Sequence, residues 1–243
     1  MDYDINSPPP YDAPLPPVVA LPVGTAERQD PASLAKLALV DSWQTLRIAL
    51  REPVDGTQRT WEHLSEPRKV AVTATYTGAL MLAFAIGLGG LINSLLGAIR
   101  DMMVSVLGMF GAGIPAMKLG MGHRVGLAFA ALLIIAGIFV TSTGFRRVYR
   151  VPVAGRADLF LAALATVPIT LFLLPVGILG ISSPVLVVPL ATLALCYSVL
   201  LLYGGFRGVA GLSEARAAMA VPAAYIVTNM LLYICFSLLI AIF

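Results

Sequence analysis

The segment VAVTATYTGALMLAFAIGLGGLINSLLGAI, residues 70–99, contains no charged residue. A helix rises about 1.5 Å per residue and the hydrocarbon core of a bilayer is about 30 Å thick, so about 20 apolar residues suffice to cross it. Four more uncharged runs reach that length, at 125–145, 159–181, 184–206 and 217–243. The sequence therefore predicts an all-α fold, a polytopic transmembrane bundle of five helices over residues 70–243.

The composition agrees with this interpretation. The chain is 58% hydrophobic and 12% charged, whereas soluble domains carry about 25% charged residues. Its net charge of +3 comes from basic residues scattered between the apolar runs, so we expect the lipid bilayer as its environment and no nucleic-acid partner. The chain starts with acidic and proline-rich residues, unlike a secretory signal, so we expect the run at 70–99 to act as an uncleaved anchor.

Residues 1–30 hold five acids against one base and are rich in proline. Such a segment buries too little apolar surface to offset the entropy of ordering it, so we expect an acidic, disordered tail. Proline-rich segments also pre-form extended helices that dock on aromatic grooves. A docking segment and a merely solvated tail are both open.

Residues 31–69 form a second region. Asp30 is suited to cap a helix and Pro31 to its first position. Apolar residues then recur at spacings of three and four, which predicts an amphipathic helix; they are Leu34, Leu37, Val40, Trp43, Leu46 and Leu50. The helix lies either in the membrane interface, with Trp43 at headgroup depth, or in the cytosol against the loops of the bundle. A polar connector follows it.

Charge decides the topology, because cytoplasmic loops carry an excess of lysine and arginine. With five spans and the N-terminus in the cytoplasm, ten lysines and arginines of residues 51–216 lie inside and three outside. Counting the uncharged segment 102–117 as a sixth span gives six inside and seven outside. We therefore expect five spans, with 102–117 lying along or dipping into the outer face.

Two stripes of small residues repeat at intervals of four, and they predict close helix packing within the bundle or between protein partners or identical copies. The stripes are Ala71, Thr75, Ala79, Ala83 and Gly87 in the first span and Ala220, Ala224 and Thr228 in the last.

Prolines interrupt the third to fifth spans, and each removes a backbone hydrogen bond. The freed groups either line a polar cavity of the kind that transporters use or are satisfied within a curved bundle. The residues of the possible cavity are Thr166, Pro168, Thr170, Pro175, Tyr225 and Asn229.

The residues missing from the apolar runs argue against catalysis and against proton-coupled transport. None of the five runs contains Asp, Glu, Lys, Arg or His, although proton relays and most coupled transporters need such groups. The patterns HExxH, GxSxG and GxxxxGK[ST] are missing. Cys196 and Cys235 lie in apolar runs without His or carboxylate neighbours, so we expect small packing residues. We therefore expect no enzyme and no catalytic, cofactor-binding or metal-binding residues.

Three segments resemble the Yip family, five-span membrane proteins named for interaction with Rab-type GTPases. These are YSVLLLYGGFRGVAGLSEARA (197–217), ALATVPITLFLL (163–174) and ALREPVDGTQRTWEHL (49–64), the last similar to bacterial members. The resemblance implies a five-span fold with a cytosolic N-terminus, in a bacterial inner membrane. The DLYGP signature of eukaryotic members is missing, so GTPase binding is not implied.

The function expected from these features is that of a non-enzymatic membrane protein that binds or organises partners or lipids. The alternative is a permease or transporter subunit whose substrate path lies at the proline-kinked third to fifth spans.

Overall fold

The computed structural model describes residues 31–107, 119–152, 154–181 and 183–242. The expected tail at 1–30 and residues 108–117 of the expected surface segment lie outside this part. The described residues form helices and no strands. In chain order the helices are α1 Pro31–Arg51, α2 Gly56–His63, α3 Glu66–Leu82, the π-helix η1 Ala83–Leu88, α4 Gly89–Leu107, α5 Met121–Val148, α6 Gly155–Ala165, α7 Val167–Ile178, α8 Pro184–Gly208 and α9 Glu214–Ile242.

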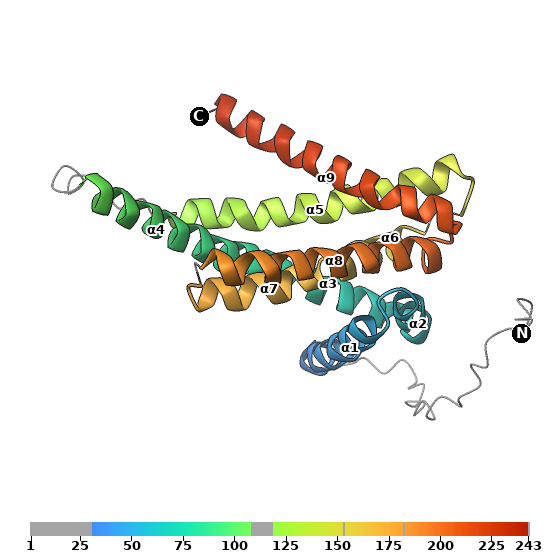
Figure 1. The fold of residues 1–243 in the computed structure, drawn as a ribbon. Coiled ribbons are helices and arrows are strands. Elements are labelled where there is room, and N and C mark those ends of the chain that lie inside the picture. Colours follow the sequence, from blue (N-terminus) through green and yellow to red (C-terminus); the bar gives the residue numbers. More distant parts are fainter. Residues whose placement is uncertain (1–30, 108–118, 153, 182, 243) are drawn as a thin grey trace, which may run out of the picture.

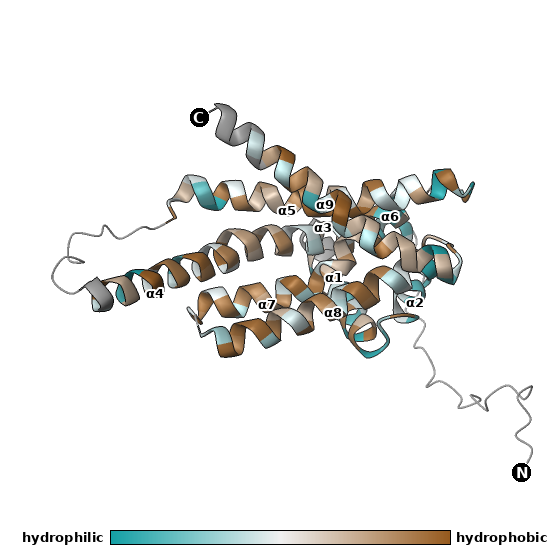
Figure 2. Cartoon of the chain, turned by 45° about the horizontal axis from the view of Figure 1, so that its top comes forward, coloured by the Kyte–Doolittle hydropathy of each residue, from teal (hydrophilic) through white to brown (hydrophobic). Residues whose placement is uncertain are grey.

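Five helical segments are long and apolar enough to cross a membrane, which confirms the predicted all-α bundle. They are Glu66–Ser105, Met121–Val148, Gly155–Ile178, Pro184–Gly208 and Glu214–Cys235. They run roughly side by side, while α1 and α2 lie against one end of the bundle (Figure 1). Hydrophobic residues predominate along α4, α5, α7 and α8, and hydrophilic residues gather around α2 and the neighbouring ends of α5 and α6 (Figure 2). We call this polar end the α1 end.

The third segment, α6 and α7, is the centre of the bundle. Two thirds of its apolar window (67%) is buried inside the protein, against 22–39% for the other four segments. Phe160, Leu161 and Leu164 of α6 are fully buried, and they pack with residues of α3, α5, α8 and α9. The segment therefore contacts both its sequence neighbours, α5 and α8, and the first span, α3 and η1.

The first segment is longer than a bilayer requires. Its 40 helical residues extend about 60 Å, compared with about 40–45 Å for a membrane with its headgroups. The helix starts at Glu66 and continues past Arg100 and Asp101 to Leu107. Residues 102–107, expected on the outer surface, therefore continue the first helix and do not start a separate one.

Proline breaks the third segment. Pro168 has no N–H to donate to the carbonyl of Leu164, and it disfavours helical backbone at the residue before it. The break lies at Thr166, whose N–H turns to the carbonyl of Ala163 at 3.2 Å. Helix α7 then begins at Val167. Pro168 therefore breaks the central segment as expected, whereas α7, α8 and α9 continue as helices past Pro175, Pro189 and Pro222.

The first and third segments touch through their backbones. A Cβ on Gly177 would lie only 2.0 Å from the carbonyl oxygen of Gly87, and one on Gly87 would lie 2.3 Å from that of Leu173. A Cβ on Gly90 would lie 2.5 Å from the carbonyl oxygen of Gly177. The π-helical turn η1, which contains Gly87, lies at this contact. Of the predicted stripe, Ala83 and Gly87 are buried here, while Ala71, Thr75 and Ala79 are half-buried.

Helices α5 and α9 form a second close contact. A Cβ on Gly137 would lie 2.4 Å from the hydroxyl oxygen of Thr228. Ala220 and Ala224, the other members of the predicted stripe in the last span, are completely buried on the same helix. Small residues at both contacts let the helices approach closely where the hydrophobic effect does not drive them together.

We expect Gly177→Ala to destabilise the protein, by about 1–3 kcal/mol as for other overpacked sites, because the new methyl group would meet backbone that has no side chain to move aside. The midpoint of thermal unfolding in mild detergent measures the effect. Gly78→Ala in α3 is the matched control, since a Cβ there meets nothing within 4 Å, and it should leave the midpoint unchanged or slightly higher. Equal midpoints for the two variants would contradict the backbone contact.

Candidate functional site

A buried ion pair joins three helices at the α1 end. Arg146 of α5 donates from Nε to Oδ1 of Asp158 in α6 at 2.9 Å, and Ser142 donates to the same oxygen at 2.5 Å. The guanidinium also donates to the carbonyl oxygens of Pro152 and Val209, each at 2.7 Å. Both charged side chains are almost completely buried, at 5% and 0% exposed. One arginine therefore ties α5 to α6, to the loop after α5 and to the end of α8.

Removing either partner would leave an unpaired charge. A carboxylate or guanidinium in a buried setting is costly unless it is paired and hydrogen-bonded, and Arg146 has three acceptors among the described residues. The second carboxylate oxygen of Asp158, Oδ2, is buried without a partner there. The contacts of the pair are with neighbouring helices and loops, which gives it a structural role.

A second tie attaches α1 to the first span. The guanidinium of Arg68 donates two hydrogen bonds to the carboxylate of Asp41, which is 2% exposed. The hydroxyl of Tyr76 donates to the carbonyl oxygen of Ser42 at 2.7 Å. Asp41, Ser42 and Thr45 are all buried. Helix α1 thus binds α3 through a polar face.

The apolar stripe of α1 lies largely on the other side. Leu37, Val40 and Trp43 are 39%, 53% and 67% exposed, whereas Leu46 is buried and Leu50 half-buried. The stripe was predicted correctly as a helical pattern, but the face that packs on the protein is the one with Asp41. The buried face is mixed, because Ala38, Leu46 and Ala49 pack beside the polar residues. The outward face combines large apolar side chains with basic ones such as Arg47, and a helix with such a face is suited to lie in a membrane interface.

The chain after α1 closes over the end of α8. A Cβ on Gly204 would lie 2.2 Å from the carbonyl oxygen of Val54, and one on Gly208 would lie 2.7 Å from Gln58. Helix α2, which begins at Gly56, lies in the segment expected to be a plain polar connector. Arg207 reaches Glu214 of α9 at 3.4 Å. Residues 209–213, between α8 and α9, are therefore a packed turn between two spans.

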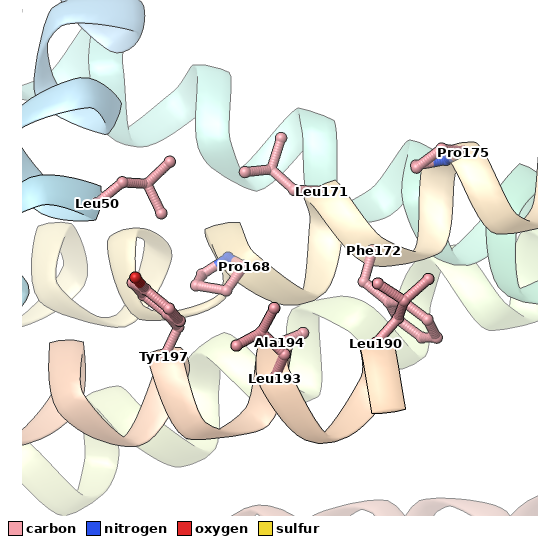
Figure 3. A pocket seen from close by; sticks show the side chains of 9 residues that line it. All are labelled: Leu50, Pro168, Leu171, Phe172, Pro175, Leu190, Leu193, Ala194 and Tyr197. Atoms are coloured by element: carbon pink, nitrogen blue, oxygen red, sulfur yellow. The ribbon is translucent and has the colours of Figure 1, made fainter. Parts of the chain in front are cut away.

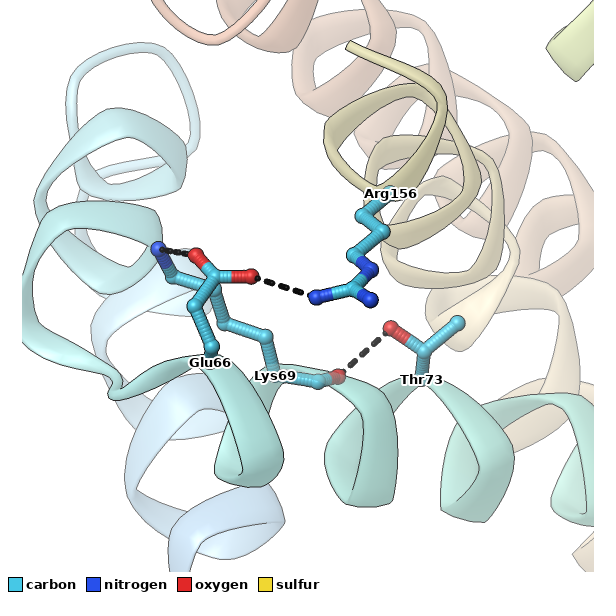
Figure 4. A network of polar contacts seen from close by, with 4 residues as sticks. All are labelled: Glu66, Lys69, Thr73 and Arg156. Carbon is cyan, nitrogen blue, oxygen red and sulfur yellow. Dashed lines mark hydrogen bonds and ion pairs between the residues drawn. The ribbon is translucent and has the colours of Figure 1, made fainter.

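A surface network joins α3 to α6 at the same end (Figure 4). Glu66 accepts a hydrogen bond from Lys69 at 3.0 Å and from Arg156 at 3.3 Å. The ammonium of Lys69 also lies 4.0 Å from the ring centre of Trp61 in α2. Exposed pairs of this kind contribute little individually, so the buried pairs carry most of the polar stabilisation.

A small cavity lies between α5 and α9 in the middle of the bundle. It has a volume of about 30 Å³ and is lined by four hydroxyl-bearing side chains among apolar ones: Thr166, Ser198, Tyr225 and Thr228. The hydroxyl oxygens of Ser198 and Thr228 are buried without a partner in the described part of the chain. A cavity of this size has room for a water molecule and not for a typical transport substrate.

A larger groove, of about 270 Å³, runs between α7 and α8 (Figure 3). Pro168 and Pro175 line it together with Leu193 and Tyr197 of α8 and Leu50 of α1. Its lining is almost entirely apolar.

The residues of the predicted polar cavity therefore separate. Thr166 and Tyr225 line the hydroxyl cavity, and Pro168 and Pro175 line the apolar groove. Thr170 donates to the carbonyl oxygen of Thr166 at 3.2 Å, and Asn229 is exposed on α9. Sequence reasoning missed Ser198, which stands in an apolar run without a distinguishing pattern, and it placed Arg146 and Asp158 in a loop.

No cluster of three His, Cys, Asp or Glu side chains suited to a metal ion is found among the described residues. Cys196 and Cys235 are free thiols on α8 and α9. In comparisons with family models, curated proteins and solved structures, nothing matches the chain. The resemblance to the Yip family stays a prediction.

We expect Asp158→Asn to lower the free energy of unfolding by about 3–5 kcal/mol, because it leaves the charge of Arg146 buried and unpaired. Thermal unfolding in mild detergent measures the loss. Glu66→Gln, which removes an exposed pair at the same end, should change the midpoint little. The double variant Arg146→Met with Asp158→Asn should recover part of the loss, and a further fall in the double variant would contradict a charge effect.

Proposed function

We propose that this integral membrane protein is non-enzymatic and of Yip-like type, and that it binds or organises lipids and protein partners at its α1 end. The α1 end faces the cytoplasm, as the charge distribution favours, and the host membrane is a bacterial inner membrane. The observation that carries the proposal is the orientation of α1. Its buried face is held to the bundle by the pair of Asp41 with Arg68, and Leu37, Val40 and Trp43 are left outward.

The depth of α1 supports a membrane platform over a helix in water. Leu50, near the end of α1, lies in the same groove as Tyr197, which is eleven residues before the end of α8 at Gly208. Eleven helical residues correspond to about 16 Å. The end of α1 therefore lies beside the apolar part of α8 and not beyond the end of that helix.

The alternative is a permease subunit, and the hydroxyl cavity is the observation that favours it. A substrate path would have to open between α5, α7, α8 and α9. The cavity is about 30 Å³, which holds a water molecule but no substrate, and helices α5 and α9 touch beside it at Gly137 and Thr228. These dimensions support a binding or organising role over transport.

Fluorescence of Trp43 tests the platform. In a Trp61→Phe background, which leaves Trp43 as the single tryptophan, reconstitution with brominated phospholipids should quench Trp43 more strongly when the bromines lie near the headgroup than near the chain end. The indole prefers the interface for its amphipathic ring. Quenching by aqueous iodide with none by bromolipids would place α1 in water and refute the proposed platform.

Thiol accessibility separates the platform from the permease. In a background of Cys196→Ala and Cys235→Ala, we expect Thr228→Cys and Ser198→Cys to resist a small charged thiol reagent from both sides of the membrane in reconstituted vesicles, and to react after denaturation. Labelling of the Thr228→Cys variant before denaturation would favour a substrate path and contradict the packed core.

Two exposed positions serve as controls for that measurement. Ser213→Cys, beside α9, and Met121→Cys, at the opposite end of α5, should each react in the native protein from one side only, and from opposite sides. In intact cells Met121→Cys should react with an impermeant reagent and Ser213→Cys should not. The reverse pattern would invert the proposed topology.

A further inference from the structure

The groove between α7 and α8 has the form of an acyl-chain site. Pro168, Leu171, Phe172 and Pro175 line one wall, and Leu190 and Leu193 line the other (Figure 3). Leu171 and Leu193 are 44% and 56% exposed, so this face of the bundle meets the hydrocarbon of the bilayer. A narrow apolar channel in such a face is filled by lipid chains, because a void would lose dispersion contacts along its lining.

The α1 end of the groove is polar. The ring of Tyr197 reaches toward Leu50 of α1 with its hydroxyl at the tip (Figure 3). Arg47 precedes Leu50 by three residues and therefore lies next to it on the helix surface, and Arg51, four residues after Arg47, lies next to Arg47. Both arginines are exposed.

The two arginines are also uncompensated within the described part of the chain, where neither forms an ion pair. Glu52, the acid adjacent to Arg51, is already paired with Arg59 at 2.7 Å. Arginine side chains beside apolar surface extend their charged ends toward the headgroups, where guanidinium groups bind phosphate with directed hydrogen bonds. The charge at the mouth of the groove therefore complements an anionic headgroup.

We propose that the groove binds one anionic glycerophospholipid. One acyl chain lies between α7 and α8, the glycerol esters lie at the hydroxyl of Tyr197, and the phosphate lies at Arg47 and Arg51. This inference rests on the proposed function and names the lipid class that the α1 end recognises. The prolines of α7 gain a role from it, since Pro168 and Pro175 line the groove.

Lipid retention tests the assignment. The full-length protein is reconstituted with equal amounts of phosphatidylglycerol and phosphatidylcholine, extracted in mild detergent, and analysed by native mass spectrometry for bound lipid. We expect a complex with one phosphatidylglycerol to dominate over the complex with phosphatidylcholine. Near an anionic surface each basic residue contributes about fivefold in affinity, so the pair Arg47→Gln with Arg51→Gln should reduce this preference by up to about thirtyfold.

Matched variants separate the headgroup from the chain. Arg147→Gln removes an exposed arginine at the same end of the bundle, on α5, and should leave the preference unchanged. Leu193→Trp fills the groove and should remove both lipids, whereas Leu195→Trp, on the same helix but outside the groove lining, should retain them.

Equal retention of the two lipids by the wild-type protein, or an equal loss in Arg147→Gln, would overturn the anionic site. If the wild-type protein retains no lipid and Leu193→Cys cross-links two copies, the groove belongs to a second copy and the assignment fails. The result for Trp43 stays independent: shallow quenching without lipid preference would leave the platform standing and refute only this site.

Discussion

The bilayer requires every backbone polar group to be satisfied inside the protein, and this constraint determines most of the structure. It makes the five apolar segments helical, but it gives them no reason to associate, because lipid chains are as apolar as leucine. Association then depends on two devices. Glycines and other small residues bring α7 against η1, and α9 against α5, at backbone distance. Charged pairs hold the α1 end, where Arg146 alone joins segments from α5, α6 and the end of α8.

The fold class could be predicted because uncharged runs such as 70–99 are long enough, as helices, to cross the hydrocarbon core of a bilayer. Helix α2 could not be predicted, because GTQRTWEH has the composition of a connector. Its packing depends on contacts with other helices: Gly56 lies against α1, and Gln58 lies against Gly208 of α8. The buried ion pair of Arg146 with Asp158 could not be predicted either, for a related reason. Asp158 and Arg146 stand where a loop between spans is expected, and nothing in their spacing says that the helices extend to include them or that the two side chains meet.

The candidate sites show the same limit. Thr166 and Tyr225 were found because prolines draw attention to their neighbours, while Ser198 joins the hydroxyl cavity only through the packing of α8 against α7 and α9. For α1 the helical pattern was readable but its direction was not. In a water-soluble protein such an apolar stripe packs on the protein interior. Beside a bilayer an exposed part of it, such as Leu37, can face lipid instead, and Asp41 then becomes an interior residue.

The contact between Gly87 and Gly177 also has a mechanical consequence. Helices that meet through side chains can slide by a fraction of a turn while rotamers readjust. At the contact of Gly87 with Gly177 the nearest atoms are backbone atoms, and no side chain lies between them that could rearrange. A small axial shift would drive Leu88 or Val176 into the space now occupied by the opposing main chain. The first and third spans therefore behave as one rigid unit with a fixed register, and any shape change of the molecule has to take place outside this contact.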